Sequence, residues 1–205
     1  MLKLQNQGGE QTRGRYWIMA AAVLVFLTIV LGNVTRTSGA AEACPDWSTC
    51  YGQLALPAEQ FARVSMLHQI LSAAALVFTL TALWRVLVHE SISRWVRLPL
   101  AAAAVILLLQ TGLGAGMALL EATPAVNALH LGLALLALGS LLTAVTAAFR
   151  QPGETARLQQ ILKVRFNRLT ALTTALTFVL LLSGALVTAA DAGAACSGWP
   201  LCGSL

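Results

Sequence analysis

Charged side chains are scarce in this 205-residue chain, and that scarcity decides its physical class. Only 10% of the residues are charged, whereas 58% are hydrophobic and the mean hydropathy is +0.75. Soluble globular domains contain about 25% charged residues. The composition therefore excludes an ordinary soluble domain and indicates an integral membrane protein.

Cysteine and histidine are also few, with four and three residues respectively. The sequence has no Cys-x-x-Cys-His motif, so covalent attachment of a c-type haem is unsupported. Each cysteine pair encloses five residues and has no histidine nearby, which makes a poor zinc site. The glycine-rich stretch 112–116 follows no strand and lies inside an apolar run, so it is not a phosphate-binding loop.

Long apolar runs are plentiful. A helix needs about 20 apolar residues to cross about 30 Å of hydrocarbon. Five runs of this kind lie at 16–34, 64–87, 98–120, 127–149 and 169–190. The sequence therefore predicts an all-α integral membrane protein. Residues 1–150 form a four-helix transmembrane bundle, and residues 151–205 contribute a connection, a fifth spanning helix and a loop.

Lys and Arg are distributed unevenly between the two sides of these runs. The N-terminal tail and the second and fourth connections hold eleven of the 13, and only Arg36 and Arg63 lie on the other side. Cationic loops are retained in the cytoplasm. We therefore expect a multi-pass protein of a bacterial-type inner membrane, with the N-terminus cytoplasmic and the C-terminus and all cysteines outside. The net charge of +5 indicates contact with anionic lipid and not nucleic-acid binding.

One pattern occurs twice and predicts a repeat. Cys-x2-Trp-x2-Cys begins at Cys44, twelve residues after Gly32, and again at Cys196, twelve residues after Gly184. The second copy is the first shifted by 152 residues. The sequence therefore predicts one four-helix repeat followed by the opening helix of a second.

The N-terminal segment could be a cleavable secretory signal instead of a spanning helix, and the repeat bears on this choice. The basic tail, the first apolar run and Ala41-Glu42-Ala43 resemble a cleavable secretory signal. No such signal could lie around Gly184, whose segment copies the one around Gly32. We therefore favour a retained spanning helix.

Two segments leave alternatives. Glu154–Arg168 is charged and predicts either an amphipathic helix at the membrane interface or a solvated linker. Gly112 and Gly116 form a small-xxx-small face, which favours close helix packing over contact with a flat macrocycle.

The two cysteine pairs lie on the expected oxidising face. We therefore predict disulfides joining Cys44 to Cys50 and Cys196 to Cys202. Closing such a ring contributes about 2 kcal/mol on the chain-entropy model. The alternative is a pair of thiols that cycles between oxidation states during function.

Two of the three histidines lie inside spanning runs, where an ionisable side chain is costly and indicates a functional site. His68 follows the outer end of its helix, near Arg63, by five residues, and His130 follows Ala125 by five. Both are therefore expected about 7 to 8 Å below the outer boundary. Paired imidazoles at one depth on facing helices suit axial ligation of one haem iron.

Other interpretations of the histidines exist. His68 and His130 could be buried side chains that bond neighbouring carbonyls. A zinc or di-metal site is disfavoured because no thiolates or carboxylates surround them. The third histidine, His89, lies in a cytoplasmic connection and is expected to be solvated.

Together these features resemble the haem A synthase family of cytochrome oxidase assembly. The likeness spans Gly32 to Cys202 and rests on Gly32-x3-Arg36-Thr37-Ser38-Gly39, Cys44-Pro45-Asp46-Trp47 with Cys50, Gln110-x2-Leu113-Gly114, the two histidines and the doubled cysteine motif. It implies a protein of two four-helix repeats, each with a bis-histidine haem site near the outer face. One site holds haem O, whose methyl group is oxidised to a formyl, and the other holds a b-type haem that passes electrons.

The resemblance assigns roles to particular residues. His68 and His130 match the ligand pair of the first repeat, and Arg36 matches an arginine suited to a haem propionate. The family's Glu-x-x-His-Arg reads Ser65-Met66-Leu67-His68-Gln69 here. A carboxylate at that position can stabilise a cationic intermediate or move a proton, which Ser65 cannot do, so no catalytic residue is assigned.

Three functions follow. The first is a short haem A synthase that dimerises, with one haem as substrate and the other as electron relay. The second is a catalytically silent haem-binding subunit of a respiratory membrane complex, and the third is a haem-free scaffold. We favour a haem A synthase-like protein with bound haem, b-type or haem O/A, and leave its activity open. Its expected partners are membrane lipid and haem, with a second copy or respiratory-complex subunits beside them.

Overall fold

The computed structural model describes residues 2–44, 46–47, 49–88, 93–120, 122–150 and 165–194. Its elements are α1 (Leu2–Thr37), η1 (Ala40–Glu42), α2 (Gln60–Val88), α3 (Arg94–Leu119), α4 (Pro124–Phe149), α6 (Arg165–Ala189) and η2 (Ala192–Ala194). These described residues contain no strand, which confirms the all-α prediction. The predicted Cys196–Cys202 disulfide, His89 and residues 151–164 lie outside the described ranges.

Five helices are long and apolar enough to cross a membrane, as predicted. These spans are Gly14–Thr37, Gln60–Val88, Arg94–Leu119, Pro124–Phe149 and Arg168–Ala189. Each span begins one to four residues before the corresponding apolar run, because polar residues that cap or open a helix precede its hydrophobic part. For example, α2 begins at Gln60, where the Glu59 carboxylate accepts hydrogen bonds from the backbone N–H groups of Phe61 and Ala62. Thr123 caps α4 in the same way by accepting from the N–H of Val126.

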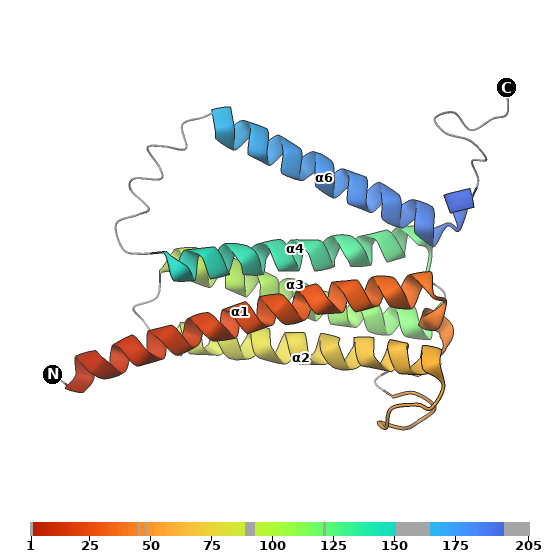
Figure 1. Ribbon diagram of the computed structural model, residues 1–205, viewed down its shortest axis with the longest axis horizontal. Coiled ribbons are helices and arrows are strands. Elements are labelled where there is room, and N and C mark those ends of the chain that lie inside the picture. The colour runs from red at the N-terminus through yellow and green to blue at the C-terminus, as the bar shows by residue number, and fades with distance from the viewer. Residues whose placement is uncertain are drawn as a thin grey trace.

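The first four helices lie side by side as a bundle, and α6 lies against α4 on the side away from α2 (Figure 1). Within the bundle, α1 packs on α2 and α4, and α3 packs on the same two helices. Leu182 of α6 packs against Gly132 of α4. A Cβ atom on Gly132 would lie 3.0 Å from Cδ2 of Leu182. We call the end of the bundle that carries Cys44 and Cys50 the cysteine end.

The packed core occupies the half of the bundle away from the cysteine end. Its buried residues include Ile18, Ala21, Ala22, Val25, Ala75, Ala82, Val86, Leu100, Ala103, Ala137, Leu141 and Ala144. Small alanine side chains let the helices approach closely. His68 and His130 each precede the first core residue of their helix, Ala75 or Ala137, by seven residues, so both histidines lie on the side of the core nearer the cysteine end.

Candidate functional site

His68 lies on α2 and packs against α1. A Cβ atom built on Gly32 would lie 2.8 Å from Cε1 and 3.3 Å from Nδ1 of His68. The imidazole therefore rests directly on the backbone of α1, at a position where only glycine leaves room for it. Gly32 is the residue that opens the first copy of the sequence repeat.

His130 lies on α4 and is held by α3 at two points. The side-chain amide of Gln110 donates a hydrogen bond of 2.9 Å to the backbone carbonyl of His130. One turn further along α3, a Cβ atom on Gly114 would lie 3.2 Å from Cε1 of the His130 ring. Residues four apart share a helix face, so a single face of α3 supports both the backbone and the ring of His130.

His68 and His130 lie at similar depths within their own helices. His68 lies eight residues into α2 and His130 six residues into α4, so each lies about 9 to 12 Å along its helix from the first residue. This arrangement fits the level pair that haem ligation requires.

Four buried polar atoms near this level have no hydrogen-bond partner among the described residues. They are Nδ1 of His68, Nδ1 of His130, Oε1 of Gln69 and Oε1 of Gln110. More than about 90% of buried polar groups in proteins are hydrogen-bonded. Neighbouring carbonyls therefore leave one nitrogen of each ring without a hydrogen-bond partner among the described residues.

These residues fit a haem better than a bare metal ion. No three His, Cys, Asp or Glu residues gather into a metal site within the described ranges. Two imidazoles can ligate a metal whose other ligands come with a macrocycle, as in haem. The unpaired ring nitrogens could supply those two ligands, and the glycines allow the rings to lie close to the neighbouring helices.

Ser65 lies one turn before His68 on α2, on the same helix face. Its side chain is buried, with 7% exposure. The position is therefore close to the candidate site, as the resemblance implies, but the side chain carries no carboxylate.

Arg36 lies at the cysteine end of α1 and contacts the end of α6. Its guanidinium donates a 3.0 Å hydrogen bond to the backbone carbonyl of Ala189, at the last residue of α6. A cation suits this position because the C-terminus of a helix carries partial negative charge. Sequence analysis missed this contact, since 153 residues separate the two partners.

The small-residue face of α3 differs from the expectation. No other described segment places an atom within 4 Å of a Cβ position on Gly112 or Gly116. Close helix packing is therefore the wrong explanation for these two glycines within the described chain. Gly114, between them, is the glycine that makes a contact.

Cys44 and Cys50 form the predicted disulfide. Both are buried and pack with Ala62 and Met66 in the first two turns of α2. The sulfur of Cys44 lies 3.4 Å from the carbonyl oxygen of Ala62. The disulfide therefore holds the connection between α1 and α2 against the side of α2.

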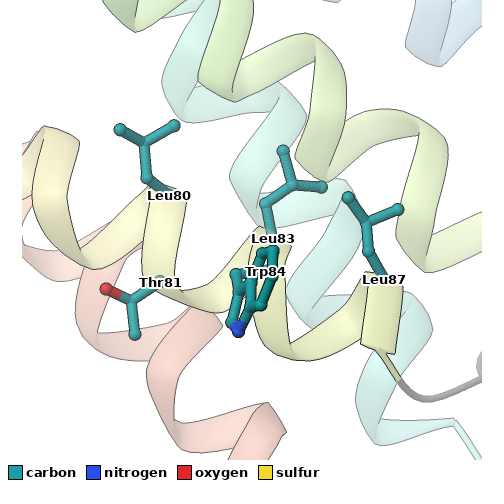
Figure 2. A pocket seen from close by; sticks show the side chains of 5 residues that line it. All are labelled: Leu80, Thr81, Leu83, Trp84 and Leu87. Atoms are coloured by element: carbon teal, nitrogen blue, oxygen red, sulfur yellow. The ribbon is translucent and has the colours of Figure 1, made fainter.

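A separate hollow lies on the surface of α2. Figure 2 shows its lining side chains, which all come from this helix: Leu80, Thr81, Leu83, Trp84 and Leu87. Leu80 follows His68 by twelve residues, or about 18 Å of helix. Because only one helix lines it and no titratable group is present, this hollow is a lipid-facing groove and not part of the histidine site.

Fold and site together define a helical membrane bundle with two buried histidines on its spanning helices. Comparison with known proteins then identifies the family. The family model described as cytochrome oxidase assembly protein, COX15-CtaA, matches residues 15–64 and 59–205. The chain belongs to this family, as predicted from its motifs.

Individual relatives carry a more specific name. A heme A synthase of Staphylococcus aureus (strain bovine RF122 / ET3-1) is 32% identical over 194 residues, which are 90% of this chain and 62% of the relative. A heme A synthase of Staphylococcus haemolyticus (strain JCSC1435) is 28% identical over 196 residues, which are 92% of this chain and 63% of the relative. The chain therefore spans less than two thirds of the length of these relatives.

Proposed function

We propose that this protein acts in haem A biosynthesis and cytochrome oxidase assembly by binding one haem, whose iron would be held by His68 and His130. The observation that carries the proposal is the pair of buried Nδ1 atoms, one on each ring, that lack hydrogen-bond partners. The relatives named heme A synthase support the same class of ligand. When bound, the haem would supply a redox-active iron.

The chain's own residues would fix the ligands before a haem arrives. Gly32 and Gly114 contact the two imidazoles and restrict how the rings can turn. Gln110 fixes the backbone of His130. Such contacts around a ligating histidine set its orientation and tune the metal it holds.

Arg36 would bind a propionate of that haem. It lies four residues after Gly32, so both lie on the face of α1 that contacts His68. A guanidinium can pair with a carboxylate through two parallel hydrogen bonds. A haem propionate would then compete with the Ala189 carbonyl for this side chain.

The arginine distribution supports an orientation with the cysteine end outside. Among the described residues, cations stack on aromatic rings at the opposite end, where Arg85 lies 5.2 Å from the Trp17 ring centroid and Arg15 lies 5.9 Å from that of Phe149. A cytoplasmic location of this end obeys the positive-inside rule. The Cys44–Cys50 disulfide then lies on the oxidising side.

Two activities fit this haem site. In the first, the chain is a haem A synthase in which two copies pair, one haem being substrate and the other relaying electrons. In the second, the chain is a haem-binding subunit without synthase activity. Ser65 favours the second, since its position is the one at which the family resemblance expects a carboxylate.

Co-expression with a haem O producer, followed by haem extraction and chromatography, tests the proposal. Wild-type protein should carry a low-spin haem, and His68→Ala and His130→Ala should each lose it. His89→Ala is the matched control, because this histidine is predicted to lie in a connection outside the site. Haem A in the extract identifies a synthase, whereas b-type haem or haem O alone identifies the silent subunit.

Two results would contradict the proposal. Wild-type protein that contains no haem would make it a scaffold. Haem that survives replacement of both His68 and His130 would have to bind at another site.

A further inference from the structure

The connection between α1 and α2 carries an unusual surface. Its side chains Trp47, Tyr51, Leu54 and Leu56 are all exposed, with Leu54 at 76% and Tyr51 at 60%. Residues 51–58 contain no charged side chain. We call these four side chains the loop patch. An exposed apolar patch of this kind indicates a binding surface.

The connection is held rigidly in this shape. The Cys44–Cys50 disulfide closes it, and the Asp46 carboxylate accepts hydrogen bonds from the Gly52 N–H and the Thr49 hydroxyl. Tyr51 has a φ of +55°, which bulky residues rarely adopt. Backbone strain of this kind is retained where it places a side chain for a function.

The loop patch lies beside α2 and not beyond its end. Met66, six residues after the first residue of α2, packs against the disulfide and is only 2% exposed. Six residues of helix measure about 9 Å. Figure 1 shows the connection, in orange, at the side of α2 that faces away from α4 and α6. The disulfide therefore lies at the level of the first two turns of the spanning helix.

The 29 residues of α2 measure about 44 Å, whereas the hydrocarbon layer is about 30 Å thick. Part of α2 must therefore lie outside the hydrocarbon. Because its first turn carries the polar residues Gln60 and Arg63, we expect this end of α2 to lie among lipid headgroups. Phe61, on the first turn, is itself exposed, so this end of α2 also presents an apolar side chain on its surface.

We propose that this disulfide-closed connection is an interfacial membrane anchor. Trp47, Tyr51, Leu54 and Leu56 insert into the headgroup region of the leaflet at the cysteine end. Trp and Tyr are enriched at membrane interfaces because each combines an apolar ring with a polar group. The anchor fixes the depth of the first turns of α2, which lead to His68. It requires no haem and is independent of the proposed function.

Tryptophan fluorescence in a bilayer tests this anchor. The full chain is reconstituted into vesicles of phosphatidylcholine and phosphatidylglycerol, with or without phosphatidylcholine brominated near the headgroup end of its acyl chains. The Trp47 signal is the emission of the wild type minus that of Trp47→Phe. We expect brominated lipid to quench this signal and aqueous iodide to leave it unquenched. The Trp84 signal, obtained with Trp84→Phe, is the control for an exposed tryptophan on the spanning part of α2.

A charge variant makes the test specific for the loop patch. Leu54→Asp together with Leu56→Asp should draw the connection into water, so that Trp47 becomes accessible to iodide while Trp84 keeps its quenching by lipid. Quenching of Trp84 by brominated lipid shows that the variant is still inserted in the bilayer, so a change at Trp47 can be assigned to the loop patch. Quenching of wild-type Trp47 by iodide would overturn the anchor, and so would protection from both quenchers, which would show that another protein surface covers the patch.

Discussion

The imidazole of His68 rests on the backbone of Gly32, with 2.8 Å between its Cε1 atom and the position a Cβ atom would occupy. Real Cβ atoms almost never approach another heavy atom so closely. Either the ring or helix α1 would therefore have to move if residue 32 had a side chain. The sequence repeat supplies a natural comparison, because its second copy places Gly184 at the equivalent position, with nothing within 4 Å.

We predict that Gly32→Ala removes most of the bound haem. The added methyl group collides with the His68 ring, and overpacking of this kind costs about 1–3 kcal/mol. Gly184→Ala adds the same methyl group to open space and should leave haem content unchanged. The haem-to-protein ratio from the absorption spectrum measures both. Equal haem content in the two variants would contradict the contact.

Gln110 offers a test of how His130 is positioned. Gln110→Leu removes the hydrogen bond to the His130 carbonyl, a loss of about 1 kcal/mol. We expect a lower unfolding temperature and altered electron paramagnetic resonance of the ferric haem, because the His130 ring is less fixed. Thr111→Val is the control, since the Thr111 hydroxyl bonds only Leu107 within its own helix. An unchanged resonance with a lowered unfolding temperature would reduce Gln110 to a purely structural role.

The sequence predicts the spanning helices and the depth of the histidines, but not the individual side-chain contacts around them. Run lengths predict five spanning helices, and residue spacing predicts that His68 and His130 share a level. The glycine contacts and the bond from Gln110 to His130 could not be predicted in this way. The helices are apolar on nearly every face, so hydropathy does not indicate which face meets which neighbour. Steric fit decides that pairing, and it leaves no periodic signal.

Arg36 tests the attachment of α6. Arg36→Gln removes the charge-assisted hydrogen bond to the Ala189 carbonyl, and bonds of this class contribute about 1.5–3 kcal/mol. We expect faster hydrogen exchange at the backbone amides of Ala190 and Asp191, which close the end of α6. Arg63→Gln is the control, because Arg63 bonds the carbonyls of Pro57 and Ala58 instead. Equal exchange rates in the two variants would show that Arg36 does not hold this helix end.

Glu59 predicts a pH dependence at the start of α2. Hydrogen bonds from the backbone N–H groups of Ala62 and Phe61 lower the pKa of this carboxyl below its ordinary value. Its contribution to stability is therefore complete above the unfolded pKa of about 4.3, and is lost as the pH falls through the lower folded value. Thermal unfolding followed by circular dichroism between neutral and acidic pH measures this. Glu59→Ala should be less stable at neutral pH and lose less on acidification, whereas an acid response equal to that of the wild type would exclude the cap as its cause.

A variant at Ser65 tests whether a missing carboxylate is the only thing that prevents this chain from forming haem A. Ser65→Glu places a carboxylate one turn from His68, and we expect more haem A than in the wild type when haem O is supplied. Burying a carboxylate is costly unless it is paired, so haem content and unfolding temperature must be measured beside the product. Ser65→Gln has nearly the same volume without the charge and should yield no additional haem A. If both variants bind haem and neither forms haem A, then the missing carboxylate is not what keeps this chain silent.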